Sequence, residues 1–278
     1  RQGARMSYGG AFQSHTGKGF TVYDTSWNIG NWNGQSQDYG AFMWKKSKYY
    51  MWANYYTGTG SAQSIDHGLD CVPAVMIIKN IDSAGSDGDW SVYHYKAGND
   101  RKFILNSETN STSNQYQGLV SDSTAFNSTT PDRFKFHVGA NDKTNKNGIK
   151  YVCWTFAGNH DENDFKQFGG SCNEGMIGCN VYTGNHSTAP TSVNLGFNPR
   201  CVMTFPQYGQ NSYGSNLLPA ISANVSNMTE TDVYTPGNNK VPFISNFWQA
   251  TGNNTFQLQT NSLFCNQQGI DYYYLAFR

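Results

Sequence analysis

Charged residues are scarce in this sequence of 278 residues, where Asp, Glu, Lys and Arg together make up only 14%. The 19 basic side chains balance the 19 acidic ones, so the formal net charge is zero. Nucleic acids and anionic lipid surfaces are bound through an excess of positive charge, which this chain does not have. The composition therefore predicts neither a nucleic-acid partner nor a membrane partner.

Long hydrophobic runs and good helix formers are also lacking. The longest apolar run of note, VPAVMII at residues 72–78, is too short to cross a bilayer. No apolar stretch typical of a signal peptide follows the opening Arg-Gln-Gly. Leu is scarce and Glu rarer still, whereas Gly, Asn, Ser, Thr, Tyr and Phe abound. This balance disfavours helices and favours strands and turns, so we predict an all-β protein.

Motifs that would indicate catalysis are missing. The sequence contains no Gly-x-Ser-x-Gly, no Walker A sequence and no His-Glu-x-x-His. Its six histidines are scattered, and we expect His67 and His94 to be hydrogen-bonded structural groups. The acidic loops at residues 82–89 and 160–164 lack the EF-hand pattern and are more typical of turns than of Ca²⁺ sites. We therefore predict no catalytic residue, no metal and no cofactor.

The six cysteines lie far apart and show no Cys-x-x-Cys spacing, which argues against a zinc site. Cysteine is readily buried as a small apolar residue. We expect four buried free thiols, at Cys71, Cys153, Cys201 and Cys265. For Cys172 and Cys179, which are close in sequence, a disulfide remains open because the redox compartment decides it.

An internal repeat organises the chain. The segment YTGTGSAQSIDHGLDCVPAVMIIK at residues 56–79 matches YTGNHSTAPTSVNLGFNPRCVMTF at residues 182–205. The same spacing separates Tyr56 from Tyr182 and Pro73 from Pro199, so the register is kept. In both segments a Gly ends a polar strand and a Pro precedes an apolar one. Landmarks held in phase in this way indicate two copies of one structural unit.

Alternating strands close each copy. Residues 133–139 and 148–156 form one pair of such runs, residues 255–261 and 269–277 another, and residues 19–44 hold a third. Alternation with a short loop between the runs predicts a hairpin in each case. Because three closing hairpins accompany only two opening units, we expect the chain to be the C-terminal portion of a longer fibre-like protein. The alternative is that the first hairpin caps the array.

We predict tandem antiparallel β-sandwich repeats with a jelly-roll-like fold. Residues 48–158 form the first repeat and 181–278 the second, joined by a connector at 159–180. Residues 1–47 are the closing hairpin of a preceding repeat or a lead-in. The strands that carry Trp90 and Phe103 should have one face in solvent. The predicted core of the first repeat is Val75, Ile77, Trp90, Leu105, Phe134, Phe136 and Tyr151.

Aromatic residues crowd the stretch from residue 27 to 56. Loops rich in Tyr, Trp, Asn and Gly can hold sugars through ring contacts and amide hydrogen bonds. The candidate glycan-binding residues are Trp27, Trp32, Tyr49 and Trp52. The alternative is that these rings pack in the core or between subunits.

The ordered series YTGTGSAQSIDHGLDCVPAVMIIKN, DGDWSVYHY, ILNSE, FNSTTPDRFKFHVG and GIKYVCWTFAG resembles a repeated domain of unknown function. That domain occurs in tail-fibre and other virion structural proteins of marine bacteriophages, including cyanophages. The likeness covers most of residues 19–278. It is weaker in the middle of the second copy, where Phe205 also replaces the Lys that ends the apolar strand.

The resemblance implies a virion component, such as a segment of a tail fibre or another projecting appendage that adheres to host-surface glycans. It brings no catalytic residues. Two alternatives stay open, a capsid-surface decoration protein and a polysaccharide-degrading enzyme with a carboxylate pair in an aromatic groove. We also expect self-association, most simply as a homotrimer, and contact with other virion proteins, because a surface rich in rings and poor in charge resembles an interface.

Overall fold

The computed structural model describes residues 44–81, 90–105, 120–127, 129–158, 176–186, 191–207, 220–223, 232–234, 248–250, 254–258 and 266–278. In this part of the chain there are sixteen β-strands and a single four-residue helix, α1 (Asp142–Asn145). All strand pairs are antiparallel. The all-β prediction is confirmed.

The first half of the chain builds a six-stranded sheet with the order β1-β8-β3-β4-β5-β6. Its strands are β1 (Met51–Thr57), β8 (Lys150–Phe156), β3 (Val75–Asn80), β4 (Trp90–His94), β5 (Arg101–Ile104) and β6 (Val120–Ser121). A two-stranded sheet pairs β2 (Gln63–Asp66) with β7 (Lys135–Val138).

The second half builds a five-stranded sheet with the order β9-β16-β11-β12-β13. Its strands are β9 (Ile177–Thr183), β16 (Asp271–Phe277), β11 (Cys201–Pro206), β12 (Ala220–Ala223) and β13 (Asp232–Tyr234). A three-stranded sheet joins β10 (Thr191–Asn194), β15 (Thr255–Leu258) and β14 (Trp248–Ala250). In chain order these pairings match those of the first half except for one strand, since β6 pairs with β5 in the large sheet whereas β14 pairs with β15 in the small one. β9 begins inside the segment 159–180 that was expected to be a connector.

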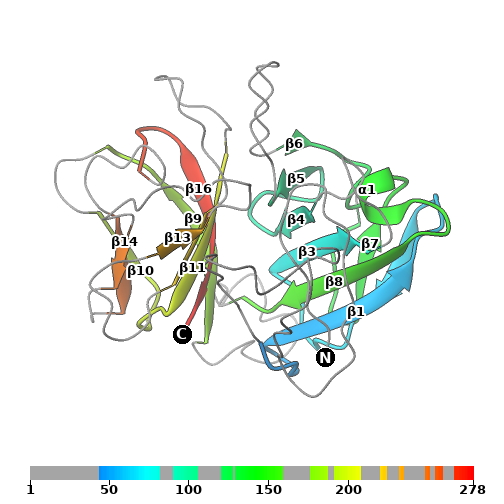
Figure 1. The fold of residues 1–278 in the computed structure, drawn as a ribbon, viewed down its shortest axis with the longest axis horizontal. Helices are drawn as coiled ribbons and strands as arrows, with labels where there is room; N and C mark the ends of the chain where they lie inside the picture. The colour runs from blue at the N-terminus through cyan, green and yellow to red at the C-terminus, as the bar shows by residue number, and fades with distance from the viewer. Residues whose placement is uncertain are drawn as a thin grey trace, which may run out of the picture.

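The two large sheets pack face to face. On β3, Val75 and Ile77 point into a core shared with Met203 and Phe205 of β11, and Leu275 of β16 joins it. Figure 1 shows β9, β11 and β16 on one side of this contact and β1, β3 and β8 on the other. Each half therefore contributes one sheet to the largest hydrophobic core of the molecule.

The small sheets cover the outer faces of the large ones. Met76 and Ile78, which alternate with the residues of the shared core, pack against Phe136 and Val138 of β7. In the second half, Val202 of β11 packs with side chains of β15 in the same way. The molecule is thus layered, and the inner strands β3, β4 and β11 are buried along their whole length.

Three features of the fold differ from the sequence-based expectation. β4 is buried along its whole length, so the predicted solvent-facing side is wrong, because both faces of its sheet are covered. The segments 133–156 and 255–277 are not hairpins. β7 pairs with β2 while β8 lies between β1 and β3, and likewise β15 pairs with β10 while β16 lies between β9 and β11. The connection crosses from one layer to the next and is too long for a tight hairpin turn.

The predicted core of the first half is largely correct. Six of its residues are buried, namely Val75, Ile77, Trp90, Leu105, Phe136 and Tyr151. The seventh, Phe134, is 59% exposed, so its assignment to the core is wrong. The hairpin expected over residues 19–44 lies outside the described residues except for Trp44. The Trp44 ring lies 5.4 Å from the rings of both Phe156 and Phe277, at the edge of the shared core.

The described cysteines are buried, and so are His67 and His94. Buried free thiols are present at Cys71, Cys153, Cys179 and Cys201, while Cys172 and Cys265 lie outside the described residues. His67 and His94 are buried and hydrogen-bonded, as expected. The two acidic loops at 82–89 and 160–164 also lie outside the described residues. Within the described ranges, no helix has the length and hydrophobicity needed to cross a membrane.

Candidate functional site

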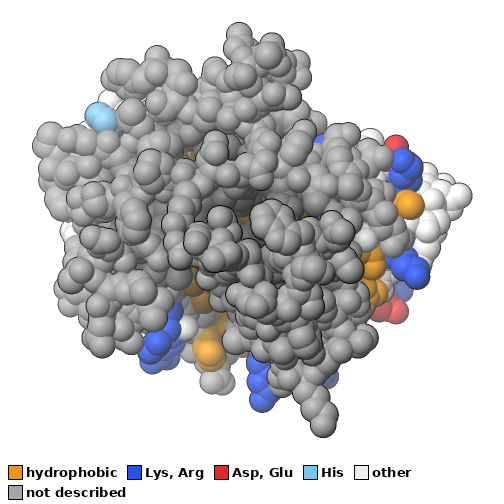
Figure 2. Space-filling model, in the orientation of Figure 1, with side chains coloured by type: hydrophobic (Ala, Val, Ile, Leu, Met, Phe, Trp, Pro, Cys, Tyr) orange, Lys and Arg blue, Asp and Glu red, His pale blue; other side chains and the backbone are white. Residues whose placement is uncertain are grey.

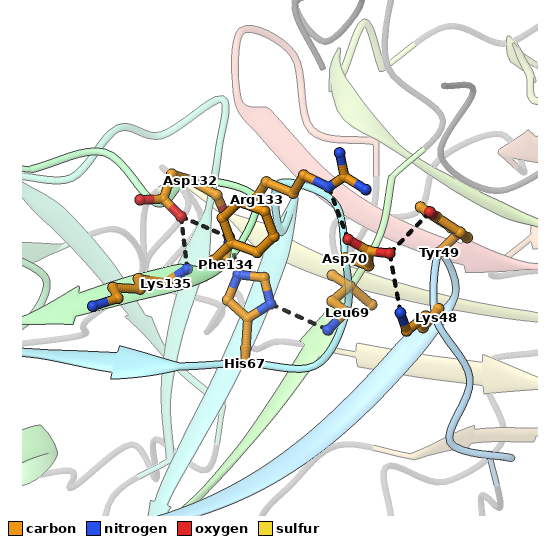
Figure 3. Close-up of polar contacts among 9 residues, drawn as sticks. All are labelled: Lys48, Tyr49, His67, Leu69, Asp70, Asp132, Arg133, Phe134 and Lys135. Carbon is orange, nitrogen blue, oxygen red and sulfur yellow. Dashed lines mark hydrogen bonds and ion pairs between the residues drawn. The ribbon is translucent and has the colours of Figure 1, made fainter. Parts of the chain in front are cut away.

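One polar cluster lies where β2 ends and β7 begins. Because these strands are antiparallel, with Asp66 opposite Lys135, the residues after β2 and those before β7 emerge at the same end of the small sheet. The loop at residues 67–71 therefore meets residues 132–134, and the chain just before β1 joins them (Figure 3). We call this group, made of Lys48, Tyr49, His67, Asp70, Asp132, Arg133 and Phe134, the Asp70 cluster.

The Asp70 carboxylate is the centre of the cluster. Its Oδ1 accepts a hydrogen bond from Arg133 Nε at 2.8 Å, and its Oδ2 accepts one from the Tyr49 hydroxyl at 3.0 Å and one from Lys48 Nζ at 3.2 Å. The bonds from Arg133, Tyr49 and Lys48, in that order, hold the pKa of Asp70 well below its usual range. Asp70 is thus ionised at neutral pH, and its oxygens are occupied by donors.

Two further groups shape the loop. The buried ring of His67 accepts the Leu69 N–H at Nδ1 over 3.2 Å, so its proton sits on Nε2, which lies 3.1 Å from the carbonyl oxygen of Asp132. Burial lowers the pKa of His67 and keeps the ring neutral. Asp132 Oδ1 accepts the N–H groups of Phe134 and Lys135 at 2.6 and 2.7 Å, which forms the turn that enters β7.

Two aromatic rings are presented to solvent beside these charges. Tyr49 is 41% exposed and Phe134 is 59% exposed. The Arg133 guanidinium lies 5.4 Å from the centre of the Phe134 ring, within the range of a cation–π contact. Tyr49 is anchored to the same loop, since its N–H donates to the Leu69 carbonyl oxygen at 2.7 Å. The result is an exposed surface of rings and fixed charges.

The four candidate glycan-binding residues have different positions. Tyr49 belongs to the Asp70 cluster. Trp52 lies next to it but is half-buried and packs on Leu69, Cys71 and Ala157. The Lys46 ammonium lies 4.1 Å from the centre of the Trp52 ring. Trp27 and Trp32 lie outside the described residues.

Sequence reasoning missed Asp70, Arg133 and Phe134. Asp70 and Arg133 come from segments far apart in the chain, and only the pairing of β2 with β7 brings them together. The backbone of Asp70 has a φ of 63°, in the left-handed region, which aspartate adopts more readily than most residues but which no motif in the sequence marks here. Gly68 is a residue that could have indicated this loop from the sequence. Only glycine fits there, because a Cβ at position 68 would lie 2.2 Å from the Trp52 indole.

The surface chemistry of the described residues is mixed. Lys and Arg side chains lie beside hydrophobic ones along the lower and right-hand margins of the face in Figure 2. In the described part of the chain, no three His, Cys, Asp or Glu side chains gather to hold a metal ion.

These features define an antiparallel, layered β-protein with an aromatic and charged cluster at one end of a small sheet. The chain belongs to the family described as "Domain of unknown function (DUF7483)", whose model matches residues 3–278. The match takes in both halves of the fold. No curated protein and no solved structure matches the chain.

Proposed function

We propose that this protein is a structural component of a bacteriophage virion, a segment of a tail fibre or another projecting appendage that adheres to glycans on the host surface. Its place would then be the outer surface of the particle. The proposal starts from the sequence series quoted above. The observation that carries the adhesive role is the Asp70 cluster, with its exposed Tyr49 and Phe134 rings beside Arg133 and Lys48.

The chemistry of the cluster suits sugar recognition. Exposed rings can cover the apolar face of a pyranose, while charged and amide groups bind its hydroxyls. The ion pair with Arg133 holds Asp70, and the bonds of Tyr49 to Asp70 and to the Leu69 carbonyl oxygen hold Tyr49 against the same loop, so the surface is formed before a ligand arrives. Pre-formed contacts bind with a smaller loss of side-chain freedom. Lys48 and Arg133 are balanced by Asp70 and Asp132, so the charges beside the ring pair can orient polar groups of a glycan without favouring acidic ones.

The finer architecture belongs to the same proposal. We infer that the two halves are tandem β-sandwich repeats with a jelly-roll-like fold. Support comes from the equal order of strands in the two large sheets, β1-β8-β3-β4-β5 and β9-β16-β11-β12-β13, and from a small sheet beside each. The shared core between the large sheets would make the pair of repeats one rigid building block.

The enzyme alternative receives less support from the cluster. Hydrolysis of a glycoside needs one carboxyl group that is protonated at working pH and a second one that is ionised. Asp70 is held ionised by three donors, and Asp132 is engaged with backbone N–H groups. A capsid-surface decoration protein stays as the second structural alternative, and locating the chain in intact particles by immunolabelling would separate it from a fibre.

Binding of the purified chain to host-surface polysaccharide tests the adhesive role. The double variant Tyr49→Ala/Phe134→Ala should bind roughly thirtyfold more weakly, since the two ring contacts contribute on the order of 1 kcal/mol each. Tyr55→Ala is the matched control, because Tyr55 is also an exposed ring, 49% accessible, but lies further along β1. Equal loss in the control, or no binding by the unchanged chain, would contradict the proposal. Shortening of the polysaccharide would favour the enzyme.

We also propose that the chain self-associates as a homotrimer and contacts other virion proteins. The low charge and high aromatic content support a contact surface. Exposed apolar side chains, among them Tyr55 and Met176, also support a contact surface. Light scattering on the purified chain should then give a multiple of 30.9 kDa. A single-chain mass at micromolar concentration would overturn self-association, and a dimer mass would overturn the number three.

A further inference from the structure

A buried lysine, an aspartate and an asparagine meet at one oxygen in the first half of the chain. Lys102 Nζ lies 2.5 Å from Asp122 Oδ2. The same oxygen accepts a hydrogen bond from Asn141 Nδ2 at 2.9 Å. Lys102 lies on β5, Asp122 directly follows β6, and Asn141 directly precedes α1. Because both nitrogens contact one oxygen, the lysine amine and the asparagine amide lie within a few ångströms of each other.

The surroundings fix all three groups. Lys102 is only 4% exposed. The other oxygen of Asp122, Oδ1, accepts hydrogen bonds from the Thr124 hydroxyl at 2.7 Å and from the N–H groups of Thr124 and Ala125, both at 3.1 Å. These bonds turn Oδ2 toward the two nitrogens. A long, flexible lysine side chain that is held in place loses much of the entropy that would otherwise oppose a reaction.

The amide of Asn141 is held at both ends. Its Oδ1 accepts the Lys143 N–H at 2.9 Å, and its Nδ2 also donates to the Thr124 hydroxyl at 3.1 Å. A donor on the carbonyl oxygen is what stabilises negative charge there during attack on the carbon. An acidic group in contact with the nitrogen is what a leaving amine requires.

We propose that Lys102 and Asn141 become joined by an intramolecular isopeptide bond, with Asp122 carrying the protons between them. Nothing in the proposed virion role is needed for this reaction. The three residues supply the nucleophile, the electrophile and the acid–base group, and no oxidant, metal or cofactor takes part.

The reaction replaces the bond from Cγ of Asn141 to Nδ2 with a bond from Cγ to Nζ of Lys102. Nζ of Lys102 passes a proton to Asp122 Oδ2 and, as the free amine, attacks Cγ of Asn141. The C–N bond to Nζ forms, and negative charge collects on Oδ1 against the Lys143 N–H. The bond from Cγ to Nδ2 then breaks while Asp122 returns the proton to Nδ2. Together with the second proton of Nζ, the nitrogen leaves as ammonium, and the net charge does not change.

The resting state is consistent with a slow, single event. Burial by itself would raise the pKa of Asp122, but the hydrogen bonds from Lys102 and Thr124 keep this pKa below its usual value. The pair is therefore ionic before the reaction, so a proton must pass from Lys102 to Asp122 before the amine can attack. The product would covalently tie β5 of the six-stranded sheet to the turn that follows β7 of the small sheet.

Intact-mass measurement of the purified full chain tests the proposal. After prolonged incubation in the folded state, the mass should fall short of the sequence mass by one ammonia. Tryptic digestion should then give a branched peptide in which the segment that follows Arg101, left uncut at Lys102, is joined to the one containing Asn141. A chain of full mass, with unmodified Lys102 and Asn141 in linear peptides, would overturn the bond.

Two variants serve as controls. Lys102→Arg keeps a cation for Asp122 but offers no amine, so it should keep the full mass. Asp122→Asn keeps the size of the side chain but cannot carry protons, and the branched peptide should be lost; its persistence would overturn the role given to Asp122. Succinimide formation at Asn147-Gly148 would also release ammonia. It yields a linear peptide and does not require Lys102. A loss of ammonia that persists in Lys102→Arg would therefore overturn the cross-link as its source.

Discussion

The ring of His94 in the six-stranded sheet donates a hydrogen bond from Nε2 to the carbonyl oxygen of Tyr274 in the five-stranded sheet, over 3.2 Å. The other ring nitrogen, Nδ1, accepts the Lys96 N–H at 3.3 Å, which places the proton on Nε2. His94 also packs edge-on against the Tyr273 ring. This neutral, fully buried ring joins the two halves of the molecule across their shared core.

The stability of the fold should therefore fall in mild acid. Burial lowers the pKa of His94 from 6.5 to about 4, outweighing the hydrogen bond to the Tyr274 carbonyl, which raises it. The unfolded chain thus binds a proton that the folded chain resists between these two values. The stabilisation is complete above the unfolded pKa and is lost as pH falls toward about 4, by on the order of 3 kcal/mol.

Urea unfolding at neutral pH and near pH 4.5 measures this loss. His94→Gln, which cannot titrate, should show a smaller difference between the two conditions than the unchanged chain. His137→Gln serves as the control, because His137 lies on the outer face of the small sheet and bonds only Ser64 among the described contacts. Equal pH dependence in the unchanged chain and in His94→Gln would contradict the assignment.

Phe136 and Phe134 should respond in opposite ways to truncation. Phe136 is fully buried between the small sheet and the six-stranded sheet, so Phe136→Ala should lower the free energy of unfolding by about 3–5 kcal/mol. Phe134 is mostly exposed, and Phe134→Ala should cost less than about 1 kcal/mol. Chemical denaturation of the two variants side by side checks the difference, and similar losses would show that the strand faces are wrongly placed.

The contrast between Phe136 and Phe134 also shows how much of the burial pattern can be predicted from the sequence. Alternation correctly places Phe136 in the core, and it would place Phe134 there too. The turn at Asp132 breaks the alternation, because its carboxylate binds two successive N–H groups and β7 begins only at Lys135. Strand positions and most buried residues follow from periodicity, as Val75 and Ile77 illustrate.

Strand partners do not follow from periodicity. The alternating patterns of β7 and β8 fit a hairpin as well as they fit the observed arrangement, in which the strands lie in separate layers. The Asp70 cluster depends on that choice, since Asp70 meets Arg133 only because β2 pairs with β7. A glycan site on tryptophans could be expected from composition, but the charged partners around Tyr49 could not.

The thiols of Cys153, Cys179 and Cys201 should not react with alkylating reagents in the folded chain. Burial raises the pKa of Cys153 and Cys179, and it raises that of Cys201 to about 12. Only the thiolate reacts readily with alkylating reagents. Iodoacetamide at neutral pH should leave these three residues unmodified in the native protein and modify them in urea, as read from peptide masses. Rapid native labelling of any of them would show that its site is open.

The same turn follows β1 in the first half and β9 in the second, the two strands at the edges of the large sheets. Gly58 donates its N–H to Ile149 O and accepts from Gly148 N–H, and Gly184 makes the same pair of bonds with Ile270 and Gly269. The buried side chain of Asn145 accepts the Thr59 N–H at 2.9 Å, and Asn266 accepts the Asn185 N–H at 3.0 Å. Tyr56 stacks on Tyr151 and Tyr182 on Tyr272, each pair with ring centres 5.1 Å apart.

Alanine at either glycine should therefore destabilise the protein to a similar extent. A Cβ at position 58 would lie 2.2 Å from the carbonyl oxygen of Lys146, and one at position 184 would lie 2.1 Å from that of Gln267. Both obstacles are backbone atoms of a tight turn, so relief requires breaking the turn, at about 2 kcal/mol or more. In Gly178→Ala the nearest atom is a side-chain carbon of Leu195 at 3.1 Å, which can move, so the loss should be smaller. Thermal and urea unfolding of Gly58→Ala, Gly184→Ala and Gly178→Ala provide the comparison. If Gly58→Ala were tolerated while Gly184→Ala was not, the two turns would not be equivalent supports of the fold.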